Sequence, residues 1–240
     1  MEKTDVAHRK DVDASVINMI PKLVPILTRR IKEYHQMFSL PLIAEMWEET
    51  LSRSFEELGH HTTWTPDRSH RVGEDMRIKD CDQSRISCKS GQFVNNRELG
   101  KMCVKFNGSR STRFETLEEK ISHFSESHDD YYFLLAKDKK FDQKYQLLIF
   151  ESPLCRVDQL TWTESASGKQ WRGTGPFCAE IGKAMSAQLW TTLPIDMITH
   201  RYEIDCRTKA EEKDDAQTGS KDDSGQGGGE EDGSDESGEG

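Results

Sequence analysis

Two short stretches of alternating apolar and polar residues, 73–78 and 85–91, constrain the fold of this 240-residue chain more than any other feature. Each is typical of a β-strand, and the polar residues between them are typical of a turn. Side chains alternate between the two faces of a strand, so Met76 and Ile78 share one face while Asp75 lies on the other. The sequence therefore predicts a hairpin with one apolar and one polar face.

The polar face of this hairpin combines a carboxylate, a hydroxyl and an amine. By the same alternation, Ser87 and Lys89 lie on one face of the second strand, beside Asp75. A carboxylate supplies the hard oxygen that Mg²⁺ prefers, and a nearby lysine can orient or deprotonate a water molecule. We expect this face to hold a divalent cation and a phosphate together. The alternative is an ordinary amphipathic hairpin with a solvated polar face.

The hairpin and the helix before it resemble the PD-(D/E)xK nuclease superfamily, and within it the type II restriction endonucleases. Glu74-Asp75 stands where Pro-Asp is usual, and Ser87-Cys88-Lys89 stands where (D/E)-x-K is usual. The resemblance implies a restriction-endonuclease-like α/β fold, in which helices flank a mixed central sheet. It also implies Mg²⁺ as the cofactor.

The resemblance assigns a role to each residue of the motif. Asp75 is implied to bind Mg²⁺ directly, the backbone carbonyl of Cys88 to add a ligand, and Ser87 to support the site by hydrogen bonding. Lys89 is implied to position the attacking water and to stabilise charge on the scissile phosphate. The implied activity is Mg²⁺-dependent, sequence-specific cleavage of double-stranded DNA to 5′-phosphate and 3′-hydroxyl ends.

A serine at the usual acidic position leaves a second carboxylate to be supplied from elsewhere, and some restriction enzymes recruit one from a helix. A helix predicted to begin near Ser39 and to end near Leu58 carries several glutamates. Glu48, at the edge of its apolar face, is the expected catalytic and metal-binding glutamate. Glu57 is an alternative because a glutamate inside an apolar arc needs a partner such as a cation. Glu98, downstream of the lysine, is a third candidate.

The sequence predicts one nuclease-like domain over residues 1–208. It comprises a helical part at 12–58, the catalytic hairpin at 73–91, and the remaining sheet and recognition elements at 102–208. Pro21 and Pro25 are expected to break or kink the first helix. Strand-like segments at 102–106, 131–136 and 145–150 are expected to complete the sheet, and a capping box at 116–119 predicts a further helix.

The acidity of the chain is confined to its last segment. The formal net charge is -10, and residues 209–240 hold twelve acidic residues against three lysines. This Gly-, Ser-, Asp- and Glu-rich segment cannot bury enough apolar surface to fold, so we expect a disordered tail. The rest of the chain is nearly neutral and can carry a basic cleft.

The cysteines and the apolar runs indicate the compartment. None of the six cysteines forms a Cys-x-x-Cys pair, and no stretch has the length of a membrane span or the pattern of a secretory signal. We therefore expect reduced thiols, a cytoplasmic location and no membrane partner.

Four basic residues are candidates for DNA contact. A predicted turn at 107–109 precedes Arg110 and Arg113, which lie before a helix start, where phosphates are commonly bound. Arg172 and Lys183 lie in a region of mixed aromatic and polar residues and are expected to reach base edges or phosphates. An ordinary polar surface is the alternative for both segments.

The resemblance also implies partners. These are double-stranded DNA, a second copy of the chain if the target is palindromic, and a cognate DNA methyltransferase. An alternative is a non-catalytic nucleic-acid-binding or assembly protein on a decayed nuclease fold. A third possibility is a structural α/β protein that binds no DNA specifically.

Overall fold

The computed structural model describes residues 3–65, 75–81, 83–110, 114–126, 129–183 and 187–207, and for residues 3–15 and Ser109 it describes the backbone alone. The chain divides into two units, Met1–Cys206 and Arg207–Gly240. Every described helix and strand belongs to the first unit. The expected tail at 209–240 lies outside the described residues.

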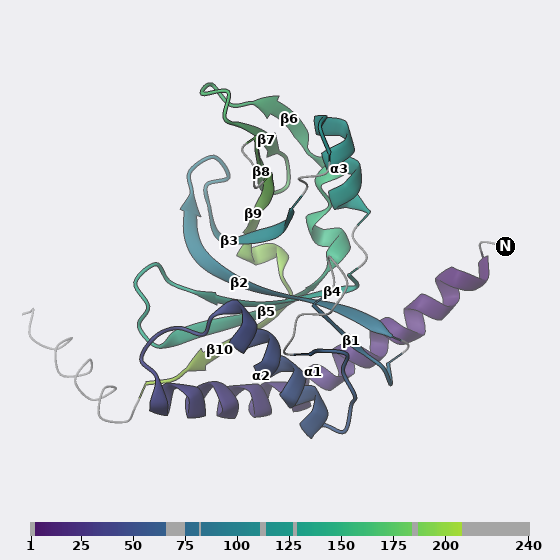
Figure 1. Cartoon of the computed structure of the whole chain (residues 1–240), viewed down its shortest axis with the longest axis vertical. Coiled ribbons are helices and arrows are strands. Elements are labelled where there is room, and N and C mark those ends of the chain that lie inside the picture. The colour runs from purple at the N-terminus through teal and green to yellow at the C-terminus, as the bar shows by residue number, and fades with distance from the viewer. Residues whose placement is uncertain are drawn as a thin grey trace, which may run out of the picture. The chain divides into compact units, whose positions relative to one another are not determined.

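Ten strands form one mostly antiparallel sheet in the order β10-β5-β4-β2-β3-β9-β8-β7-β6, with β1 paired to β2 (Figure 1). Among the described strands, only β2 and β4 run parallel. The strands are β1 Met76–Ile78, β2 Ser84–Asn96, β3 Lys101–Arg110, β4 Tyr131–Lys137, β5 Lys144–Glu151, β6 Thr161–Glu164, β7 Gln170–Thr174, β8 Cys178–Gly182, β9 Gln188–Pro194 and β10 His200–Asp205. The prediction of a mixed α/β protein is confirmed at this level.

Helices cover both faces of the sheet. The α-helices are α1 Lys3–Met37, α2 Ala44–Glu57 and α3 Leu117–Ser125, and the short 3₁₀ helices are η1 Ser152–Cys155, η2 Val157–Gln159 and η3 Ile195–Met197. One hydrophobic cluster lies between α1, α2 and the sheet, and it includes Phe133. The other contains residues of α3, β3, β8 and β9, and it includes Leu134. Successive residues of β4 thus serve opposite faces, as strand alternation requires.

The first helix continues through its two prolines, so the helix is not broken at Pro21 and Pro25. Burial explains why the helix persists. Full burial of one aliphatic side chain contributes about 1.5–3 kcal/mol, whereas an interior proline costs about 3 kcal/mol. The buried stripe of α1 contains Val16, Ile20, Leu23, Leu27 and Ile31.

The second helix begins at Ala44, five residues later than predicted from Ser39. Pro41 disfavours helical geometry at the residue before it. A hydrogen bond also fixes the segment between α1 and α2, because the N–H of Leu42 donates to the hydroxyl of Tyr145 at 3.0 Å. A side chain of β5 therefore fixes the path between α1 and α2.

The predicted hairpin is confirmed for its described residues, since β1 and β2 pair antiparallel with Met76 opposite Ile86. The capping box is also confirmed at Thr116 and Glu119. The predicted turn at 107–109 is wrong, because β3 continues to Arg110 with a register shift against β9. None of the described helices is long and apolar enough to cross a membrane.

Candidate active site

The carboxylate of Asp75 lies where the pairing of β1 with β2 ends. The carboxylate then acts as the acceptor for a backbone donor of β2, because the N–H of Cys88 donates to Asp75 Oδ2 at 2.6 Å. In an antiparallel ladder, the N–H and the carbonyl of one residue face the same neighbouring strand. The carbonyl of Cys88 therefore also faces the side of Asp75, where a carbonyl ligand was expected.

Two side chains of β2 converge on the same oxygen of Asp75. Lys89 Nζ lies 2.9 Å from Asp75 Oδ2, and Ser87 Oγ donates to that oxygen at 3.2 Å. The side chains of Lys89 and Asp75 are 21% and 19% exposed, so the ion pair is partly withdrawn from water. The structure thus brings the three side chains of the predicted polar face together.

The electrostatics of this cluster favour a protonated lysine. Burial lowers the pKa of Lys89, but the charges of Asp75 and Asp129 and a hydrogen bond to Asp75 act in the other direction, and the net pKa is raised. Lys89 is therefore a cation and a hydrogen-bond donor here. It is suited to holding an anionic group or orienting water rather than to removing a proton.

Sheet geometry separates Cys88 from its two neighbours. Ser87 and Lys89 pair with Tyr132 and Leu134 of β4, which pack in the cluster on the α3 side. Cys88 pairs with Phe133 and packs with it on the side of α1 and α2. The polar residues of the motif therefore belong to the α3 side of the sheet.

Glu48 lies on α2, which covers the other side. Burial raises the pKa of the Cys88 thiol well above its ordinary value, and the charges of Asp75 and then Glu48 raise it further. The charge of Glu48 therefore acts on the Cys88 thiol. Among the described residues, no three His, Cys, Asp or Glu side chains come together as a group that could hold a metal ion.

Asp129 is a carboxylate of this cluster that the sequence patterns did not indicate. It lies two residues before β4, is 6% exposed, and lies beside Ser87, which acts to lower its pKa. Burial raises its pKa to about 7; the charge of Lys89 acts against this shift, and that of Asp75 adds to it. In the sequence, Asp129 stands just before an apolar segment that is typical of a strand. Only the parallel pairing of β4 with β2 shows that this position lies beside the motif.

The two alternative glutamates have other partners. Arg29 Nη2 lies 2.5 Å from Glu57 Oε1 and Arg30 Nη2 lies 2.9 Å from Glu57 Oε2, so the partners of Glu57 are cations of α1. Glu98 follows the far end of β2 and pairs with Arg172 at 3.0 Å. The seven residues from Lys89 to the end of β2 span roughly 23 Å at about 3.3 Å each. Glu98 therefore does not join the site around Asp75.

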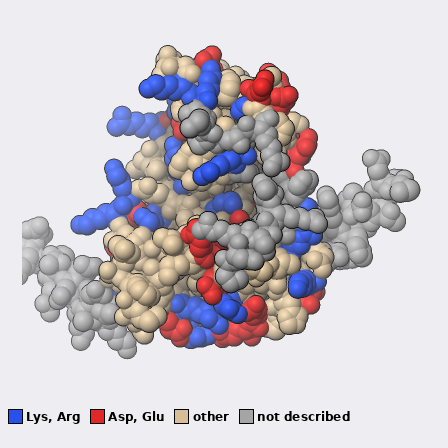
Figure 2. Space-filling view, viewed as in Figure 1, with Lys and Arg blue, Asp and Glu red and all other residues tan. Residues whose placement is uncertain are grey.

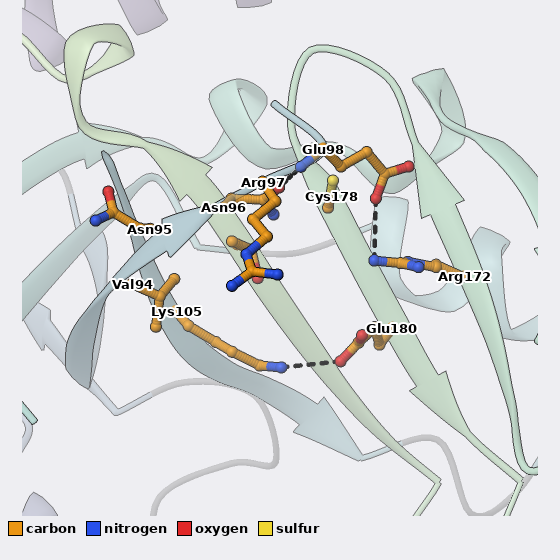
Figure 3. A pocket seen from close by; sticks show the side chains of 10 residues that line it. Val94, Asn95, Asn96, Arg97, Glu98, Lys105, Arg172, Cys178 and Glu180 are labelled. Atoms are coloured by element: carbon orange, nitrogen blue, oxygen red, sulfur yellow. Dashed lines mark hydrogen bonds and ion pairs between the residues drawn. The ribbon is translucent and has the colours of Figure 1, made fainter. Parts of the chain in front are cut away.

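Arg172 and Glu98 line a pocket formed by β2, β3, β7, β8, β9 and the β2–β3 turn (Figure 3). Its volume is about 440 Å³, and a second ion pair crosses it from Lys105 Nζ to Glu180 Oε2 at 2.9 Å. Figure 3 shows Arg97 reaching over the same pocket from the β2–β3 turn. The pocket therefore offers both hydrogen-bond donors and acceptors.

The four candidate DNA contacts do not gather in one place. Lys183 forms an ion pair with Glu164 and lies 4.6 Å from the ring of Trp171. Trp171 packs on the α3 side, and its neighbour Arg172 points to the opposite face of β7. Arg110 is exposed at the end of β3, and Arg113 lies outside the described residues.

Charge is unevenly distributed over the visible surface (Figure 2). Lysine and arginine side chains predominate on the left flank of the view, whereas both signs mix along the lower edge near α1 and α2. The left flank of this view is therefore locally basic. No protein-family model matches the chain, and no curated protein shows significant similarity to it.

Proposed function

We propose that the protein is a Mg²⁺-dependent, sequence-specific endonuclease of double-stranded DNA with a PD-(D/E)xK site on a restriction-endonuclease-like fold. The observation that carries the proposal is the convergence of Ser87, Cys88 and Lys89 on one oxygen of Asp75. A fully solvated polar face would not need three donors on one carboxylate, whereas the partly buried carboxylate of Asp75 does. A phosphodiester-cleaving site needs such a preorganised group.

The donor set around Asp75 suits Mg²⁺. Carboxylate and carbonyl oxygens are hard ligands, and Mg²⁺ typically uses one or two carboxylates and keeps several waters. In the proposed site, Asp75 and the carbonyl of Cys88 would hold the ion. When bound, Mg²⁺ lowers the pKa of water and stabilises charge on the phosphoryl oxygen.

The residues of the chain have distinct tasks in the proposed reaction. Lys89 holds the attacking water and a phosphate oxygen, and its raised pKa keeps the required positive charge. Ser87 fixes the carboxylate of Asp75. The water oxygen forms a bond to phosphorus while the bond to the 3′-oxygen breaks. The water loses a proton to solvent and the 3′-oxygen gains one, which leaves 5′-phosphate and 3′-hydroxyl ends.

DNA contact is proposed on the α3 side of the sheet, where Ser87 and Lys89 face. Lys183 beside Trp171 and Arg110 at the end of β3 are the described candidates for phosphate contact there. A palindromic target would suit a homodimer. A cognate DNA methyltransferase and a cytoplasmic location complete the proposal.

Cleavage of mixed phage and plasmid DNA, with and without Mg²⁺, tests the proposal. Wild-type protein should give discrete fragments only with Mg²⁺, and Asp75→Asn and Lys89→Ala should each lower the rate by orders of magnitude with modest loss of DNA binding. Lys79→Ala, which removes an exposed lysine of the same hairpin, is the matched control and should cut normally. Equal activity in Lys89→Ala would refute the assignment.

A second candidate function has one observation in its favour. The described residues contain no group of three acidic, histidine or cysteine side chains that could hold a metal ion. A non-catalytic nucleic-acid-binding protein on a decayed nuclease fold would have this property. It predicts no turnover in Mg²⁺ together with retained DNA binding in Ca²⁺, which a binding titration in Ca²⁺ beside the cleavage assay detects.

A further inference from the structure

We infer that Asp129 supplies the second carboxylate of the metal site, in place of the acidic residue whose position Ser87 occupies. The inference rests on the proposed function and names a residue of that same site. It replaces the expected recruitment of Glu48 from a helix by recruitment of an aspartate that lies just before the neighbouring parallel strand. The role follows from where β4 begins, which residues surround Asp129, and how the charges balance.

The start of β4 is fixed against β2 just beside the motif. The N–H of Asp130 donates to the carbonyl of Arg85 at 2.9 Å, and the N–H of Arg85 donates to Asp130 Oδ2 at 2.8 Å. From there the parallel register runs through Ile86 opposite Tyr131. The backbone next to Asp129 is thus fixed where β2 and β4 first pair. The position of Asp129 therefore does not depend on a long, flexible side chain.

Asp129 lies on the correct side of the sheet. Ser87, whose hydroxyl donates to Asp75 Oδ2 at 3.2 Å, also lies beside the carboxyl group of Asp129 and acts to lower its pKa. Ser87 is therefore a common neighbour of the two carboxyl groups. Glu48 belongs to α2, and the thiol of Cys88, on which its charge acts, faces away from Ser87 and Lys89. A cation bound between Asp75 and Asp129 would have both carboxylates within one face of the sheet.

The charge of the cluster favours a cation. Two carboxylates, Asp75 and Asp129, share the nearby lysine Lys89, and Asp129 is almost fully buried. A buried carboxylate without sufficient compensating charge is costly, and a divalent ion removes that cost. Arg85 compensates only in part, because its guanidinium Nη2 also lies 3.7 Å from Asp130 Oδ1.

Binding of Mn²⁺ alone, followed by the electron paramagnetic resonance signal of free Mn²⁺, tests the inference on the full chain. Mn²⁺ uses the same oxygen ligands as Mg²⁺. Loss of an outer-shell partner costs about 10–100-fold in metal affinity, so Asp129→Asn should weaken binding at least as much. Asp138→Asn, which removes an exposed carboxylate after β4, is the matched control and should leave affinity unchanged.

A relocation variant guards against a general effect on folding. Ser87→Asp combined with Asp129→Ser returns the carboxylate to the usual motif position and should restore Mn²⁺ affinity to within about 10-fold of wild type. Glu48→Gln is the competing variant. Wild-type affinity in Asp129→Asn, or a large loss in Glu48→Gln with none in Asp129→Asn, would overturn the inference.

DNA cleavage measured beside Mn²⁺ binding separates this inference from the proposed function. A chain that binds Mn²⁺ through Asp129 and cuts no DNA keeps the metal assignment and refutes the nuclease. If the wild-type chain cuts DNA and the Asp129→Asn variant binds Mn²⁺ with normal affinity, the nuclease assignment stands and the role of Asp129 is refuted. A wild-type chain that binds no Mn²⁺ refutes the metal assignment directly.

Discussion

At the scale of single residues, the buried carboxylate of Asp129 makes stability depend on pH in the absence of metal. Its pKa is about 7 in the folded protein against an ordinary value of 3.8. The folded state therefore holds the proton more tightly, and its favourable contribution is lost as pH rises from about 4 to about 7. We expect the stability of Asp129→Asn relative to wild type to increase over this range, by at most about 4 kcal/mol. Urea unfolding in EDTA at pH 5 and pH 8 measures this, and an equal difference at both pH values would contradict it.

The residues of the site differ in how far the sequence could predict them. Asp75, Ser87 and Lys89 are close in sequence, and strand alternation alone was enough to predict that they share a face. Asp129 lies just before a strand that reaches β2 only after β3 and α3 have intervened, so no local pattern could place it. Glu57 was considered a ligand because it falls inside an apolar arc, but α1 provides Arg29 and Arg30 as its partners.

At the scale of elements, α2 is held to the sheet by buried side chains and contributes to stability accordingly. Leu51 is fully buried in the cluster that α1 and α2 form with the sheet. Leu51→Ala should lower the free energy of unfolding by about 2–5 kcal/mol. Leu40→Ala, at a side chain that is 73% exposed, should change it by less than about 0.5 kcal/mol. Equal effects in denaturant titrations would contradict this packing.

Elements with strong local patterns were predicted well, and those determined by distant partners were not. The hairpin and the capped helix α3 follow from alternation and from the reciprocal bonds of Thr116 and Glu119. The continuous α1 depends on burial against strands that come much later in the chain. The continuation of β3 past Gly108 depends on pairing with β9. In both cases tertiary contacts override the local preference of proline or of a turn sequence.

At the scale of the whole molecule, β10 is the last described strand and the first unit ends at Cys206. Ile204 and Cys206 are the last buried side chains of the cluster beside α1 and α2. Removal of residues 209–240 should therefore leave the free energy of unfolding unchanged within about 0.5 kcal/mol. Removal from His200 onward takes away β10 and should destabilise the domain strongly. A stability loss in the shorter deletion, measured by thermal and urea unfolding, would show that the acidic segment contributes to the fold.

The parallel pairing of β2 with β4 has a consequence for protein synthesis. The hairpin with Asp75 and Lys89 leaves the ribosome early, but Asp129 follows only after β3 and α3. The strand β4 is in turn secured by β5, and β5 by β10 at the end of the folded unit. A nascent chain therefore carries the motif long before it carries all the residues of the proposed metal site. If the chain is a nuclease, its own fold delays the ability to cut DNA until translation of the domain is almost complete.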